Sequence, residues 1–355
     1  MYSDKELYPD FFLSWNRFLE TGNSVGFFEP DELNEIIEIY ITEDQLDKAR
    51  KTINYALEIY PEDDELLYDI LLLLNDFDLW NDLLDLIKKQ KETDIWIDGH
   101  QLAALLHLGM EEDAIHFFRK MKNKYKSSSE NLSIIYQSMG ESLLETGLFE
   151  SSIDVMKEAI SILGEETDFI WILLQSYCAL GNAKEVVKYA EKIQTKNPLN
   201  GETWHRLGLI YSDIDENESA IEALENAQAL GYKPKVNLLV LITAYEKNGN
   251  YNKVIEKAKE YLNLFSENQQ ILLLAAKAAQ IMEKWEDAIF FTSKAINLTP
   301  DIDSIYLFQS SIYLQIGDPA KAVEILQKGI DKTLDLDGEL QKEIYRILTN
   351  ESNKQ

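Results

Sequence analysis

A periodicity of 34 residues constrains the fold of this 355-residue chain more than any other feature of its sequence. The clearest copy starts at residue 201 and sets large and small side chains at fixed spacings: Trp204, Leu207, Gly208, Tyr211, Ala220 and Leu224. Other copies follow in register, and at the position of Tyr211 they carry Leu143, Tyr177, Tyr245, Ala279 and Tyr313. A repeat of this length is one supersecondary unit, so the pattern predicts an array of stacked units.

Within each unit, the residue types predict two helices joined by a tight turn. Small residues and valine predominate at the twentieth position, as the close packing of two helices requires; Ala220, Val254 and Ala288 are examples. The fifteenth position is glycine in several units, where it suits the end of a helix. These glycines are Gly147, Gly181, Gly249 and Gly317.

The register also divides the chain into regions. Six units keep the 34-residue spacing without a gap across residues 133–336. Three partly degenerate units precede them across residues 30–132. Between the two regions, we expect the polar segment 126–131 to form a loop that absorbs extra residues. The sequence thus predicts about nine units.

Both ends of the array are expected to have their own elements. Residues 1–29 are predicted to form a helix, over 8–21, and a turn packed on the first unit. The helix places Phe11, Trp15, Phe18 and Leu19 on one face. At the other end we expect a capping helix over residues 337–350 and a polar tail over residues 351–355, because an open stack needs a polar terminal face.

The spacing W-x2-L-G-x2-Y, followed by an alanine and a large residue, resembles the tetratricopeptide repeat (TPR) family over about residues 30–350. The resemblance implies an all-α, right-handed α-solenoid, a superhelix of helix-turn-helix units. It also implies a concave groove lined by the first helices, in which a protein or peptide binds. The acidic opening and the segment FFEPDELNEIIEIY are similar to certain bacterial multi-TPR proteins.

The groove positions of such a fold define our candidate binding residues. In the resembling family, the second, fifth, ninth and twelfth positions of a unit face the groove; here they are acidic, rich in amides and studded with aromatic residues. This favours a partner with apolar anchors and some Lys or Arg. The predicted contacts are Tyr68, Trp96, Gln137, Trp171, Gln175, His205, Leu209 and Lys277.

Two further expectations concern these positions. The aromatic residues have an alternative role, which is to pack between neighbouring units. His205 is expected to point from a groove position, where it would make partner binding sensitive to pH near its ordinary pKa of about 6.5. The fifth positions include no lysine, so a groove that clamps the C-terminal carboxylate of a chaperone is not expected.

The charge of the chain excludes other classes of partner. The net charge is −29, with 63 Asp and Glu against 34 Lys and Arg. Nucleic acids bind through clustered basic residues, and anionic membranes repel an acidic surface, so we expect neither as a partner. The start of the chain lacks the basic and apolar regions of a secretory signal, and the apolar segment 66–87 contains five aspartates. A cytoplasmic protein is expected.

No motif for catalysis is present. His100 and His107 are seven residues apart on one predicted helix, about 10.5 Å along its axis, which is too far for one zinc ion. Cys178 is the single cysteine and has no neighbouring histidine. We therefore expect a non-catalytic scaffold or adaptor with no cofactor and no metal. The alternatives are a regulatory protein that responds to a peptide or other ligand, and a self-assembling structural array.

Overall fold

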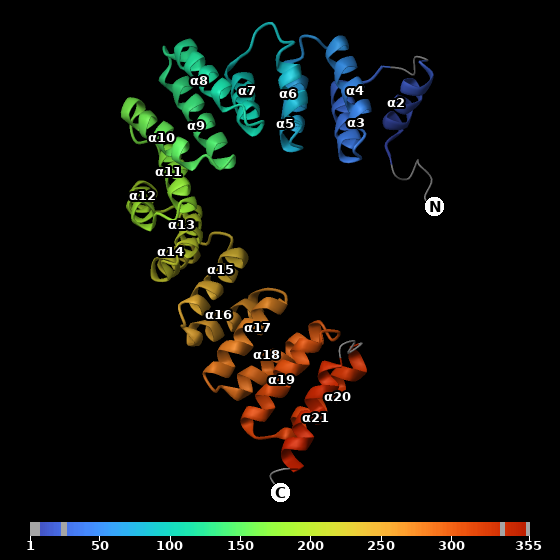
Figure 1. Ribbon diagram of the computed structural model, residues 1–355, viewed down its shortest axis with the longest axis vertical. Coiled ribbons are helices and arrows are strands. Elements are labelled where there is room, and N and C mark those ends of the chain that lie inside the picture. Colours follow the sequence, from blue (N-terminus) through green and yellow to red (C-terminus); the bar gives the residue numbers. More distant parts are fainter. Residues whose placement is uncertain (1–7, 23–26, 334–337, 353–355) are drawn as a thin grey trace. The chain divides into compact units, whose positions relative to one another are not determined.

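The computed structural model describes residues 8–22, 27–333 and 338–352, and all the regular secondary structure in these ranges is α-helix (Figure 1). Contacts divide the chain into two compact units, Met1–Ser176 and Tyr177–Gln355. The predicted all-α solenoid of helix-turn-helix units is confirmed. Each helix pair is one repeat, and each of the two bodies is one compact unit.

The first compact unit holds an N-terminal helix and four helix pairs. Its helices are α2 (Asp10–Thr21), α3 (Pro30–Thr42), α4 (Leu46–Ile59), α5 (Asp64–Asp76), α6 (Trp80–Ile87), α7 (Ile95–His107), α8 (Glu111–Tyr125), α9 (Ser129–Glu145) and α10 (Phe149–Leu163). The next helix, α11 (Thr167–Ala179), spans the division between the two compact units. In each pair, the odd-numbered helix is the first helix of the repeat.

The second compact unit continues the alternation and ends in a single helix. Its helices are α12 (Ala183–Lys196), α13 (Gly201–Asp213), α14 (Asn217–Ala229), α15 (Pro234–Lys247), α16 (Tyr251–Leu264), α17 (Gln269–Ile281), α18 (Trp285–Leu298), α19 (Asp303–Ile316), α20 (Pro319–Lys332) and α21 (Glu339–Ser352). Helix α21 packs on α19 and α20, and its own side chains Leu340 and Ile347 are buried.

The two helices of a repeat approach closely where the sequence places small residues. In the repeat of α13 and α14, Ala220 is fully buried, and a Cβ atom at Gly208 would lie 2.6 Å from Leu224 Cγ. Such a distance is too short for two carbon atoms, so only glycine fits without a shift of Leu224. The apolar side chains around this contact interdigitate and form the core of the repeat.

All nine turns between paired helices share one backbone feature. The fifteenth residue of every repeat has a positive φ, between 54° and 87°. Five of these residues are glycines, as the left-handed conformation favours: Gly109, Gly147, Gly181, Gly249 and Gly317. The other four carry side chains and were not anticipated from the sequence: Asp44, Asp78, Asp215 and Glu283. Aspartate tolerates this conformation better than most residues, whereas glutamate does not.

The polar segment before the fourth repeat is shorter than predicted. Helix α9 begins at Ser129, so residues 129–131 of the expected loop 126–131 are helical. The cause is an N-cap: the Ser128 side chain accepts a hydrogen bond from the backbone N–H of Asn131, at 3.1 Å. The extra residues of this spacing therefore lengthen α9 to 17 residues.

The termini also differ in detail from the expectation. Helix α2 is anchored by Trp15, which is fully buried and donates its indole N–H to Thr52 of α4 at 2.8 Å. Phe12, rather than Phe11, is its second buried residue. Residues 351 and 352 of the predicted tail belong to α21, and residues 353–355, like 1–7, 23–26 and 334–337, lie outside the described part.

The turn residues give a first prediction. Gly249→Glu should lower the free energy of unfolding by about 1 kcal/mol, because a side chain is strained at positive φ even where it has open space. Glu283→Gly should change it by less, since relief of strain and greater freedom of the unfolded chain oppose each other. Urea unfolding followed by circular dichroism compares the two. An equal loss of stability in both variants would contradict the claim that a side chain is strained at this turn position.

Candidate functional site

The first helices of successive repeats define one face of each compact unit, here called the first-helix face. In the first compact unit, α3 contacts α5, α5 contacts α7 and α7 contacts α9. In the second, α13 contacts α15 and α15 contacts α17. Contacts between successive second helices are sparse among the described residues. First helices thus crowd together, as they do on the inner side of a curved stack.

A recess of about 360 Å³ opens on this face between α7 and α9. Trp96 and His100 of α7 line one wall, and Ile134, Gln137 and Glu141 of α9 line the other. Gly99 and Ala103 of α7 also line the recess, and their small size leaves space for it. Two of the predicted contact residues, Trp96 and Gln137, therefore come together here.

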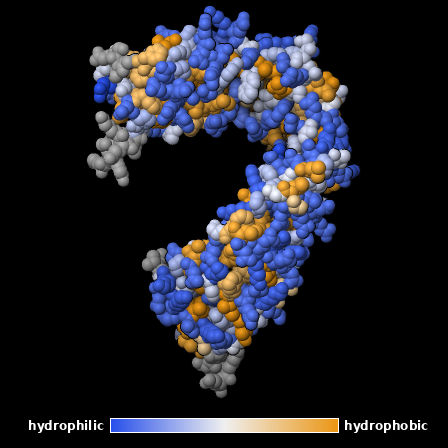
Figure 2. Space-filling model, turned by 180° about the vertical axis from the view of Figure 1, so that it is seen from behind, coloured by the Kyte–Doolittle hydropathy of each residue, from blue (hydrophilic) through white to orange (hydrophobic). Residues whose placement is uncertain are grey.

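The recess presents apolar surface to solvent. Trp96 is 62% exposed and Ile134 is 41% exposed, although both side chains are large and apolar. The Trp96 ring lies near the His100 ring, with the centroids 6.3 Å apart. Figure 2 shows, on the face of the molecule that it displays, apolar residues gathered in small groups among hydrophilic ones. Exposed aromatic residues in a recess are typical of a binding site.

Carboxylates surround this apolar surface. Glu141 accepts a hydrogen bond from the Gln137 amide at 2.9 Å, and Glu145 lies 3.4 Å from His107 Nε2. The His107 ring is stacked on Trp80, with the centroids 4.2 Å apart, which holds it against α6. The recess therefore combines an apolar wall with negative charge at its rim.

Tyr68, a third predicted contact, lies beside the recess rather than in it. Its hydroxyl donates to the carboxylate of Asp94, which also caps α7 by accepting the N–H of Ile97 at 2.9 Å. The hydrogen bond to Asp94, burial and the charge of that carboxylate raise the pKa of Tyr68 to about 12. The phenol therefore stays protonated and ties α5 to the start of α7.

Burial lowers the pKa of the His100 imidazole, because the charged form loses its hydration. The charges of Asp76 and Asp94 oppose this effect but are weaker. His100 is thus a largely neutral side chain in the wall of the recess at neutral pH. It can accept or donate one hydrogen bond there.

Two predicted contacts are buried, which corrects our expectation for them. Trp171 is 7% exposed and His205 is 8% exposed. His205 Nδ1 lies 2.8 Å from Asn237 Oδ1 in the next first helix, and the Asn237 amide N–H donates to the carbonyl of Leu224 at 2.8 Å. This orientation of the amide makes His205 Nδ1 the donor. His205 therefore joins three helices and is not available to a partner.

The remaining predicted contacts are separate from the recess. Gln175 is half-buried, and Leu209 is exposed on α13. Lys277 of α17 forms an ion pair with Glu246 of α15 at 3.0 Å. In the second compact unit, the first-helix face is thus crossed by contacts between repeats, which include a hydrogen bond from Lys247 to the Ser212 hydroxyl at 3.2 Å.

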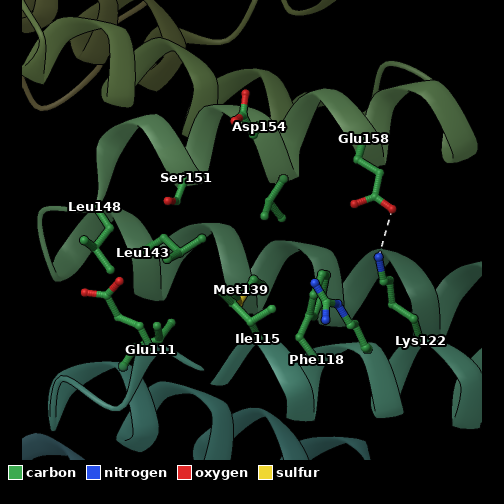
Figure 3. Close-up of a pocket in the computed structure, with 13 residues that line it drawn as sticks. Glu111, Ile115, Phe118, Lys122, Met139, Leu143, Leu148, Ser151, Asp154 and Glu158 are labelled. Carbon is green, nitrogen blue, oxygen red and sulfur yellow. Dashed lines mark hydrogen bonds and ion pairs between the residues drawn. The ribbon is translucent and has the colours of Figure 1, made fainter. Parts of the chain in front are cut away.

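A second recess, of about 260 Å³, was missed by the sequence reasoning because second-helix residues form most of it (Figure 3). Met139 and Leu143 of α9 lie between α8 and α10 in its floor. One end is closed by Lys122 of α8 and Glu158 of α10, whose charged groups are 2.8 Å apart. This ion pair is a bridge between repeats.

Neither recess contains a metal-binding cluster among the described residues. Across 8–22, 27–333 and 338–352, no group of three or more His, Cys, Asp or Glu residues could hold a metal ion. Burial, and to a lesser extent Asp213, raises the pKa of the Cys178 thiol, which disfavours its reactive thiolate form. Among the described helices, none is both long and apolar enough to cross a membrane.

The buried His205–Asn237 pair gives a prediction about stability. Asn237→Leu should lower the free energy of unfolding by about 1–3 kcal/mol, because it leaves the Nδ1–H of His205 and the Leu224 carbonyl unpaired. Asn252→Leu, at an exposed site that accepts a hydrogen bond from Lys284, is the matched control and should cost less than about 0.5 kcal/mol. Denaturant unfolding measures both. Equal costs would argue against a structural role for the pair.

His100 gives a prediction about pH. Because its folded pKa lies below the ordinary value of about 6.5, the unfolded chain takes up this proton first as pH falls. The stability that neutral His100 provides is complete above about pH 6.5 and is lost below it, down to the folded pKa. His100→Gln should therefore lose less stability than wild type between about pH 7.5 and 5.5. His116→Gln, at an exposed site, is the control, and urea midpoints are the measurement.

Comparison with known proteins identifies the repeats. The tetratricopeptide repeat model matches residues 201–230 and 303–331, which cover most of two helix pairs. The TPR repeat-containing protein YpiA of Bacillus subtilis is 21% identical over 304 residues, which are 82% of this chain and 69% of that protein. The human protein O-mannosyl-transferase TMTC1 is 23% identical over 171 residues, 47% of this chain but only 19% of the transferase.

The chain is also similar to a solved structure. A tetratricopeptide repeat protein from Parabacteroides merdae is 14% identical and aligns with 70% of this chain and 98% of its own, with a TM-score of 0.43. Two matched repeats, the continuous 34-residue register and the paired helices agree with one another. Together with the similarity to YpiA, these findings support a protein built of tetratricopeptide repeats.

Proposed function

We propose that this chain is a non-catalytic scaffold that holds a peptide or protein partner on the first-helix face of its first compact unit. Tetratricopeptide repeats generally mediate interactions between proteins. The observation that supports this particular place is the recess between α7 and α9, where Trp96 projects a mostly exposed ring beside Ile134. A partner that covers this ring removes apolar surface that the fold itself leaves in water.

The size of that effect favours Trp96 as the main anchor. An aromatic side chain buries about 150–250 Å² when fully covered. With 62% of Trp96 still exposed, a partner gains roughly 3 kcal/mol from covering it, at about 25 cal/mol per Å². Part of this gain offsets the cost of ordering the partner. A micromolar dissociation constant corresponds to a binding free energy of about 8 kcal/mol. One such anchor supplies a large share of that free energy.

The charge around the recess favours a partner with Lys or Arg. Glu141 and Glu145 line the recess, and Asp76 and Asp94 act on His100 within it. Exposed ion pairs contribute only about 0–1 kcal/mol each, so their main effect is on selectivity and on the rate of association. We therefore expect salt to slow binding more than it weakens the apolar contact.

The hydrogen-bonding groups suit a peptide backbone. Gln137 offers both an amide donor and an acceptor at the wall of the recess, and His100 opposite to it is mostly neutral. A bound peptide can replace the internal hydrogen bond between Gln137 and Glu141, because both groups are on the surface. Tyr68 and Asp94 support the wall by fixing the start of α7.

The proposal is tested by comparing two aromatic residues with similar exposure. Peptides selected from a displayed library on the wild-type protein are titrated against Trp96→Ala and against Tyr345→Ala, whose ring is 72% exposed on α21. Trp96→Ala should raise the dissociation constant at least tenfold, equivalent to about 1.4 kcal/mol, and Tyr345→Ala should leave it unchanged. Selected peptides should be rich in apolar and basic residues. Undiminished binding by a folded Trp96→Ala variant would refute the proposal.

A further inference from the structure

We infer that a third recess, between α8 and the end of α6, binds a small phosphate-bearing anion. Its volume is about 310 Å³. Lys88 and Lys91 approach from the segment after α6, and Lys120 and Lys124 approach from α8. In a chain with a net charge of −29, four lysines around one recess are an exception to the surrounding surface.

The one acidic residue that lines this recess, Asp98, is paired with a lysine of the same recess. Asp98 is 3% exposed and accepts hydrogen bonds from the Lys124 ammonium and from the Tyr125 hydroxyl, each at 2.7 Å. Lys124 also donates to the carbonyl of Thr93 at 2.8 Å. Lys124 and Asp98 therefore form an internal pair that ties α7, α8 and the loop between α6 and α7 together. The pair contributes no net charge to the recess.

The other lysines leave an excess of positive charge. Lys88 forms an exposed ion pair with Asp85 at 3.1 Å, which is worth little in water. Lys91 and Lys120 are exposed and have no hydrogen bond or ion pair with any described residue. Both lysines line the same recess. Two unpaired ammonium groups at one concave site match a ligand with two negative charges.

Charge favours a phosphate group over a single carboxylate. Lysine binds either group as a compact point charge, but a phosphate group carries about two negative charges at neutral pH and a carboxylate only one. The amides of Gln90 and Gln101 supply further donors. Phe117 and Met121 add apolar surface to the lining. A phosphate group with a short apolar substituent, or pyrophosphate itself, fits this combination.

Screening limits the ligand to a small molecule. Charges act over about 8 Å at physiological salt, so a small anion in the recess is attracted by its lysines and little affected by distant acids. A long polyanion extends beyond this distance and meets the surface of a chain whose net charge is −29. Nucleic acid is therefore a poor ligand even though the recess is basic.

This site is independent of the proposed peptide site. Asp98 and Gln101, which line the anion recess, lie on the opposite side of α7 from Trp96 and His100, because residues three and four apart share one helical face. The two recesses thus use opposite faces of the same helix. Either can be removed by substitution without touching the lining of the other.

Isothermal titration of the full chain with pyrophosphate tests the inference. Wild type should bind, and the double variant Lys91→Gln, Lys120→Gln should bind at least tenfold more weakly. The matched control Lys235→Gln, Lys328→Gln removes two exposed lysines from the second compact unit and should change the affinity less than twofold. The charge reversal Lys91→Glu, at an exposed position after α6, is a second variant that should weaken binding by itself.

Three results would overturn the inference. The first is no binding of millimolar pyrophosphate to wild type. The second is an equal loss in both double variants, which would show a general charge effect. The third is binding of succinate as tight as that of pyrophosphate, which would show a carboxylate site. Trp96→Ala should leave pyrophosphate binding unchanged, so the outcome is separate from that of the peptide experiment.

Discussion

The reversal of the chain at the fifteenth residue of each repeat is the constraint on which the rest of the structure depends. A left-handed residue ends the first helix there and sends the second back along it. The paired helices then meet at small residues such as Gly208 and Ala220, where there is no room for a larger side chain. Without the sharp turn, these positions would not face each other and the apolar stripes would remain in water.

Stacking of the repeats decides which side chains are left for binding. First helices of adjacent repeats contact one another, so a side chain at their shared face is either covered by the next repeat or left at its edge. His205 is covered and bonded to Asn237, whereas Trp96 remains exposed above a recess. The same helix, α7, carries the proposed peptide site on one side and the proposed anion site on the other.

Much of the fold was predictable because its signals are local. The 34-residue register, the small residues and the turn glycines all lie within single repeats, and they predicted the paired helices correctly. Asp44, Asp78, Asp215 and Glu283 gave no such signal, because nothing in their chemistry demands a left-handed backbone. The N-cap of Ser128 was also missed, and it lengthened α9 by four residues beyond the expected start at 133.

The sequence by itself determined the repeat, the helix pairs and the stripes of residues that each helix presents, since these follow from chain geometry within one repeat. Only the tertiary structure decided which members of a stripe are accessible. Gln137 and His205 hold the same position in their repeats, yet one lines a recess and the other is buried, because their neighbours differ. The anion recess also needed the structure, since its lysines come from segments about 30 residues apart that meet only after α7 and α8 pack.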